Sequence, residues 1–255
     1  MTSPDLAARR SVADRLEALV GALDDSWRAA LAIDADFLAA YIDLAEVPVR
    51  QGRLTAVERA LISLGVTAAV TTLDHAGMRT ALVQAKAAGA TRDQALEAVH
   101  LVSVLGVHTL VTGYPEIARV AEQHGQRLVP ESVLSAEQER IKQAFSAQRG
   151  YWSPLNEMLV RVDPAMFEAY TAFSSQPWVH GSLSPKLREL IYVAIDLSPA
   201  HLFTAGVGPH IENALRYGAT LGELVETLEV TALCGIASVR AAAPLILELF
   251  GDGAD

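Results

Sequence analysis

The stretch LSPKLRELIYVAIDLSPAHLFTAGVGPHIENALRYGATLGELVETLEVTALCGIASVRAAAP, residues 183–244, decides the fold of this chain. It contains three patterns that are typical of helix starts. The Ser-Pro pairs at 184–185 and 198–199 suit a cap followed by a first turn, and Thr220 with Glu223 has the spacing of a capping box. Apolar residues follow each start, and no strand is needed anywhere. The sequence therefore predicts an all-α fold.

A near copy of this stretch occurs earlier in the chain at a constant offset of 129 residues. Without a gap, the shift aligns Arg59 with Arg188 and the Gly-Ala-Thr triplet at 89–91 with the one at 218–220. The matches fall on capping residues and glycines, which a helical fold reuses at fixed places. We interpret the pattern as an internal duplication into two tandem helical repeats.

The boundary between the repeats is predicted in the short segment 123–135, which contains Gly125, Pro130 and Ser132. Residues 1–125 then form an N-terminal repeat and residues 126–255 a C-terminal repeat. Because this linker is short and both halves are strongly apolar, we expect the repeats to pack as one unit.

The composition limits the classes of partner. With 51% hydrophobic residues in 255, the chain can bury a large core. A net charge of −10 disfavours nucleic acid and anionic membrane surfaces as partners. The single cysteine fits a reducing compartment, and the N-terminal residues match neither a signal peptide nor a membrane anchor. We therefore expect a cytoplasmic protein with a small-molecule substrate, no nucleic acid and no membrane.

Two segments of the C-terminal half carry a resemblance. LSPKLRELIYVAI is similar to an opening helix with an Arg-Glu-Leu sequence, and HIENALRYGATLGELVETLEV is similar to a segment with a histidine, an alanine and a Gly-x-Thr turn. In both segments the chain resembles the carboxymuconolactone decarboxylase family, which shares its fold with alkyl hydroperoxidase D-like proteins. The resemblance covers residues 183–249 well and residues 54–121 more weakly. It implies an all-α fold and a homo-oligomer, with a trimer favoured.

The peroxidase branch of that fold has two cysteines three residues apart and a histidine four residues after the second. In this chain those cysteine positions are Phe203 and Gly206 before His210, and Asp74 and Gly77 in the first repeat. Thiolate attack on a peroxide needs an accessible cysteine and a resolving partner, which one cysteine cannot supply. We exclude a CxxC peroxidase and expect the single cysteine to be a core residue.

Four catalytic candidates lie in the C-terminal repeat. His210 corresponds to the family's histidine, beside a proline where we expect a kinked helix, and an imidazole there could move a proton. His201 is expected in the first turn of the helix that begins at Ser198, where the helix dipole favours a neutral base. Arg188 corresponds to the family's arginine and could bind a substrate carboxylate or an enolate, and Glu189 is a further acid–base candidate.

Each candidate also has a structural alternative. Either histidine could be packed or solvated, and Arg188 could form a buried ion pair with a helix acid such as Glu226 or Glu97. The first repeat lacks both histidines but has His75, which is a fifth catalytic candidate. We expect one working pocket and one degenerate copy.

These residues predict a cofactor-independent, decarboxylase-like lyase that acts on a small carboxylated, oxo or lactone substrate. Two alternatives remain open: a non-catalytic ligand-binding or scaffold protein, and a hydrolase or isomerase that uses the same pocket. His100 and His108 are eight residues apart but have no partner pattern for a metal, so neither a metal nor a cofactor is predicted.

Overall fold

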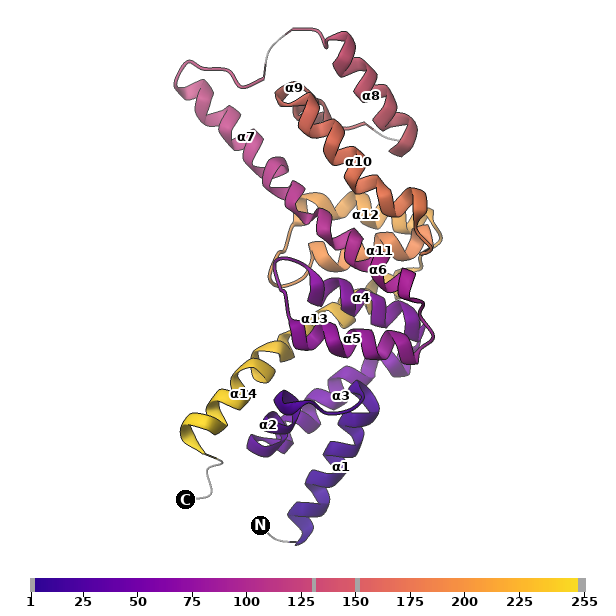
Figure 1. The fold of residues 1–255 in the computed structure, drawn as a ribbon, viewed down its shortest axis with the longest axis vertical. Helices are drawn as coiled ribbons and strands as arrows, with labels where there is room; N and C mark the ends of the chain where they lie inside the picture. Colours follow the sequence, from indigo (N-terminus) through magenta and orange to yellow (C-terminus); the bar gives the residue numbers. More distant parts are fainter. Residues whose placement is uncertain (1–2, 130–131, 150–151, 252–255) are drawn as a thin grey trace. The chain divides into compact units, whose positions relative to one another are not determined.

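The computed structural model describes residues 3–129, 132–149 and 152–251, and within these ranges it is all α with no strand (Figure 1). The fold class predicted from the sequence is confirmed. Helices α1 to α14 and two 3-10 turns, η1 and η2, follow one another as α1 (Ser3–Val20), α2 (Asp25–Ile33), α3 (Ala35–Gln51), α4 (Ala56–Ala68), α5 (His75–Ala87), α6 (Arg92–Val102), η1 (Ser103–Gly106), α7 (Val107–Gln123), α8 (Ala136–Arg149), α9 (Pro154–Val162), α10 (Pro164–His180), α11 (Pro185–Asp196), α12 (Thr204–Arg216), α13 (Leu221–Ala232), η2 (Leu233–Gly235) and α14 (Ile236–Phe250).

The chain forms two compact units. The larger unit combines residues 1–102 with residues 182–255, and the smaller unit is residues 103–181. This division reflects contacts in space, whereas the boundary at residue 125 concerns sequence repeats. The tandem repeat therefore stays a prediction, as does its packing as one unit.

The helix bounds nevertheless recur at the predicted offset. Helix α5 begins at His75 and α12 at Thr204, and both helices are 13 residues long. The residue two positions before each start, Leu73 or Leu202, has a positive φ, of 44° and 47°. Because a leucine rarely adopts this conformation, its recurrence at the same place in both halves supports the duplication.

The centre of the larger unit is the crossing of α4 and α11. Residues 187–196 of α11 are all buried, and Leu61 and Ile62 of α4 have no exposed surface. A Cβ atom added at Gly65 would lie 3.0 Å from Ile191 Cγ2, so the glycine permits close approach of the two helices. A second apolar cluster joins α1, α2, α3 and α14 around Trp27, which is 2% exposed.

The smaller unit has a core of its own. Phe145, Trp152 and Phe167 form an aromatic cluster with ring centroids 5.3 to 5.8 Å apart. Ile141, Leu159 and Val160 complete this core, to which α8, α9 and α10 contribute. Such aromatic packing stabilises a small unit through both buried area and ring geometry.

Two continuous helical stretches, Arg92–Gln123 and Leu221–Phe250, have the length and apolar composition of a membrane span. The core helices of soluble proteins meet the same criteria. Each stretch also carries a buried glutamate, Glu97 or Glu226, that forms an ion pair. The prediction that the protein has no membrane partner is not tested by these features.

Candidate functional site

The candidate site is built on α11 and α12 of the larger unit. Ser184 caps α11 by accepting a hydrogen bond from the Leu187 amide at 3.2 Å, and Pro185 occupies the first turn, as predicted. Helix α12 begins at Thr204 and contains Pro209. Because α11 is buried along most of its length, any polar side chain on it is held in a dry environment.

Glu189 and His210 form the central contact of the site. His210 Nδ1 lies 2.7 Å from Glu189 Oε2, and Asn213 Nδ2 donates to Glu189 Oε1 at 3.3 Å. The Glu189 side chain is 4% exposed and that of His210 is 29% exposed. Because a carboxylate accepts hydrogen bonds, Nδ1 donates to Glu189, and the other ring nitrogen, Nε2, is left to exchange a proton.

The orientation of the His210 ring is also fixed by packing. The ring of Tyr192 lies 4.7 Å from that of His210, centroid to centroid, with an interplanar angle of 32°. Within the described part of the chain, Nε2 of His210 makes no hydrogen bond. The imidazole is thus held by one carboxylate and one aromatic face, which is the arrangement of a preoriented proton carrier.

His201 lies in a loop, so the helix predicted to begin at Ser198 is wrong. Ser198 Oγ donates back to Ile195 O at 3.0 Å, at the end of α11, and the Phe203 amide donates to Asp196 O at 2.6 Å. These bonds close the turn that connects α11 to α12. Ser198 therefore lies in the turn that ends α11 and does not cap a new helix. Because His201 is not in the first turn of a helix, the helix dipole gives no reason to expect it to be a neutral base.

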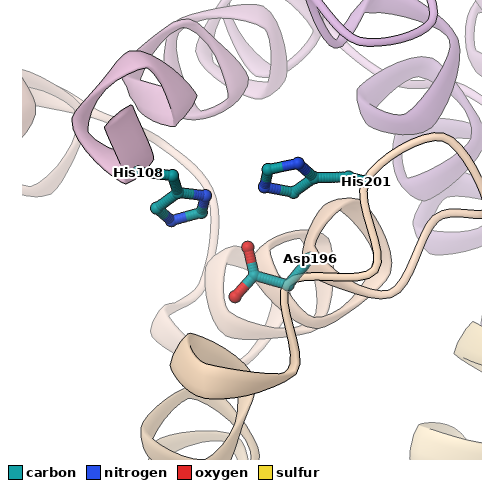
Figure 2. A group of neighbouring side chains, drawn as sticks. All are labelled: His108, Asp196 and His201. Atoms are coloured by element: carbon teal, nitrogen blue, oxygen red, sulfur yellow. The ribbon is translucent and has the colours of Figure 1, made fainter. Parts of the chain in front are cut away.

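Asp196 and His201 flank this turn, as Figure 2 shows for the end of α11 and the loop that follows it. Asp196 is 1% exposed, and burial raises its pKa to about 6, although His210 lowers it in part. Burial lowers the pKa of His201, whose ring stacks on Phe203 at 5.7 Å. Burial thus favours the neutral form of both groups.

Arg188 of α11 forms a buried ion pair with Glu97 of α6. Its Nε donates to Glu97 Oε1 at 2.6 Å, and both side chains are at most 6% exposed. Arg59 makes the corresponding pair with Glu226 at 3.0 Å. The ion-pair alternative thus describes both arginines, and a role for Arg188 in binding a substrate anion stays a prediction.

His75 is exposed at the first position of α5, directly after the cap Asp74. It does not contact the Glu189–His210 pair in any hydrogen bond of the described residues. Of the five predicted site residues, the structure thus brings together Glu189 and His210. The catalytic assignment of all five stays a prediction.

Sequence reasoning missed Tyr192, Asp196 and Asn213. The first two follow Glu189 by three and seven residues, and Asn213 follows His210 by three, so each pattern marks one face of a helix. A search for polar residues at helical spacing from the two candidates would have found them.

Two comparisons with known proteins agree with this architecture. The sequence profile of the Carboxymuconolactone decarboxylase family matches residues 164–248. A solved structure from Burkholderia xenovorans LB400, described as a candidate gamma-carboxymuconolactone decarboxylase subunit, has 39% sequence identity and a TM-score of 0.90. The match covers 94% of this chain and 96% of that one. No curated protein matches the sequence. Identity at this level over nearly the full length of both proteins shows that the chain belongs to the carboxymuconolactone decarboxylase family.

Proposed function

We propose that the chain is a cofactor-independent lyase that decarboxylates a small carboxylated, oxo or lactone substrate. The observation that carries the proposal is the 2.7 Å contact between Glu189 and His210. Family membership and the similarity to a candidate gamma-carboxymuconolactone decarboxylase subunit support a decarboxylase-like activity.

In the proposed reaction the bond between the carboxylate carbon and its neighbour breaks, and CO₂ leaves. The electron pair of that bond moves into an adjacent carbonyl group and forms an enolate. Nε2 of His210 first takes a proton from solvent, the enolate carbon takes this proton from the resulting imidazolium, and the product dissociates. Glu189 holds the ring through Nδ1 and stabilises the cationic form of the imidazole during proton transfer.

The test compares His210→Gln and Glu189→Gln with the wild-type protein. The first substrate to assay is gamma-carboxymuconolactone, followed by a panel of β-oxo acids and related lactones, with CO₂ release as the readout. General acid–base catalysis contributes about 10²- to 10⁴-fold, so we expect His210→Gln to lose a factor in that range. Glu189→Gln should lose less, because the imidazole remains.

His124→Gln is the matched control, since His124 is exposed at the end of α7. Its kcat should equal that of the wild type. Unchanged turnover in His210→Gln would contradict the proposal. Lactone hydrolysis without CO₂ release would instead place the same pair in a hydrolase, and binding without turnover of any substrate would favour the non-catalytic alternative.

A further inference from the structure

A cavity of about 300 Å³ lies in the larger unit, against α4 and α5. These helices are the counterparts of α11 and α12 at the 129-residue offset, in the half that was expected to be degenerate. The polar side chains that line the cavity include Trp27, Tyr41, Arg59, Asp74, Cys234 and Arg240. The volume lies at the lower end of the range for small-molecule sites, and most of the lining is apolar.

Arg240 provides a buried cation at one part of this cavity. It is 4% exposed, and its Nη2 and Nε donate to Asp24 at 2.8 Å and to Ser26 at 3.1 Å. Among the described residues, Nη1 of Arg240 has no hydrogen-bond acceptor. The guanidinium lies 4.4 Å from the ring of Trp27, so its plane is held in place.

Tyr41 adds a second donor, and Trp27 holds it in place. Trp27 is 2% exposed, and its buried Nε1 is closed off from the cavity as well as from any acceptor among the described residues. Its ring stacks with Tyr41 at 5.9 Å, and burial raises the pKa of Tyr41 to about 12. The phenol therefore stays protonated and can donate. Donors inside folded proteins are rarely left without acceptors, and a ligand oxygen would satisfy those of Arg240 and Tyr41.

The other polar groups distinguish this cavity from the Glu189–His210 site. The positions equivalent to Glu189 and His210 are Ala60 and Ala81, and no described residue that lines the cavity is a histidine. Burial raises the pKa of Cys234, and the nearby Asp74 carboxylate raises it further, so the thiol is not a nucleophile at neutral pH. The cavity offers donors and an apolar wall, and it lacks the Glu–His pair of the other site.

We propose that this cavity is a second small-molecule site, which binds a carboxylate with an apolar body, its oxygens against Arg240 and Tyr41. The Asp74 carboxylate repels an anion and so orients the apolar body toward the α5 side of the cavity. The proposal is independent of the lyase activity, because it concerns binding in a different part of the chain.

The test measures the binding of benzoate to the full-length protein by isothermal titration calorimetry. Benzamide, which has the same shape without the charge, is the matched probe. Benzoate should bind with a Kd of about 1 mM or tighter, and benzamide about tenfold more weakly, because charge-assisted hydrogen bonds are lost. Absence of benzoate binding up to about 10 mM, or equal binding of both probes, would overturn the proposal.

Three variants locate the bound probe. Ser63 lines the cavity, and its counterpart on α11 is Tyr192, so Ser63→Tyr should fill the space with a side chain that the equivalent helix accepts. It should abolish benzoate binding. Tyr41→Phe keeps the ring and removes the donor, so it should weaken binding about three- to tenfold. If Ser63→Tyr does not fold, Tyr41→Phe decides the outcome.

His210→Gln should bind benzoate as the wild type does. Loss of binding in His210→Gln, or unchanged binding in Tyr41→Phe, would place the probe elsewhere and refute the proposed site. Because the assay does not measure turnover, its result is separate from the test of the lyase activity.

Discussion

The helix pairs α4–α5 and α11–α12 share a backbone plan but differ in chemistry. In both pairs the second helix starts two residues after a leucine of positive φ, and an amide of that turn donates back to the first helix, Asp74 to Thr67 O at 2.9 Å and Phe203 to Asp196 O at 2.6 Å. Yet Ala60 and Ala81 stand where Glu189 and His210 meet. The comparison shows that the frame and the polar groups placed on it vary independently.

The two pairs are held together by a reciprocal set of buried charges. Glu97 of α6 accepts from Arg188 and from the Leu183 amide, while Glu226 of α13 accepts from Arg59 and from the Arg53 amide. Each glutamate thus satisfies an arginine and a backbone group from the other half of the chain. This arrangement gives both arginines a structural role, and a further role of Arg188 in binding an anion stays a prediction.

The largest expected effect comes from breaking one of these pairs. Arg188→Gln leaves Glu97 buried without its cation, which costs about 3 to 5 kcal/mol in the free energy of unfolding. Arg59→Gln should cost less, about 1.5 to 3 kcal/mol, because the Arg59 side chain is 17% exposed against 6% for Arg188. Urea unfolding at pH 7 measures both.

Equal costs for the two variants would show that the halves are energetically equivalent in spite of their difference in exposure. A cost below about 1 kcal/mol for Arg188→Gln would show that the pair is no more stabilising than a surface salt bridge. Ala substitution of exposed Arg28, which forms a surface pair with Asp25, serves as the control.

The helix starts show how much of the fold can be predicted from the sequence. Ser184 and Thr220 cap helices as predicted, because a cap needs only residues within one turn. Ser198 has the same local signal, but the bond from the Phe203 amide to Asp196 O closes a turn instead. Here a contact across seven residues overrides the local preference.

The site was predictable in its members but not in its geometry. Glu189 and His210 were both identified, yet they are 21 residues apart, and their contact depends on how α12 packs on α11. The same holds for Arg188, whose partner Glu97 is 91 residues away. The cavity beside Trp27 is less accessible to sequence reasoning, because its lining comes from α1 to α5 and from the C-terminal helices.

A second comparison concerns Asp196 and its counterpart Thr67. Since burial raises the pKa of Asp196 from 3.8 to about 6, the folded protein binds more protons than the unfolded chain between these values. Stability therefore falls as the pH rises from about 4 to 6. This shift corresponds to about 3 kcal/mol at most, and Asp196→Asn should recover about 2 to 3 kcal/mol at pH 7 and none at pH 3.5.

Urea unfolding of the variant and the wild type at both pH values measures this recovery. Thr67→Val is the matched control, because the Thr67 hydroxyl bonds only to carbonyls of its own helix and does not titrate. Its effect on stability should be the same at pH 3.5 and pH 7. An Asp196→Asn variant whose stability difference is independent of pH would refute the raised pKa.

The smallest expected effect compares Gly77 with Gly206, at the third position of α5 and of α12. A Cβ atom at Gly77 would lie 2.7 Å from Thr67 Cγ2, on a buried part of α4, and 2.2 Å from Asp74 Oδ2. At Gly206 it would lie 2.3 Å from the ring of Phe203, which is only half-buried. At Gly77 a Cβ atom would clash with a helix and with a capping side chain. At Gly206 it would clash with a ring that can rotate.

Gly77→Ala should therefore cost about 1 to 3 kcal/mol, since Thr67 and the capping Asp74 cannot both move. Gly206→Ala should cost about 0.5 to 1.5 kcal/mol, the penalty for displacing Phe203 from its preferred rotamer. Thermal unfolding of the two variants gives the difference. A larger cost at Gly206 would mean that the ring of Phe203 is held as firmly as the Thr67 side chain on α4. The loop that contains His201 and Phe203 would then be as rigid as that helix.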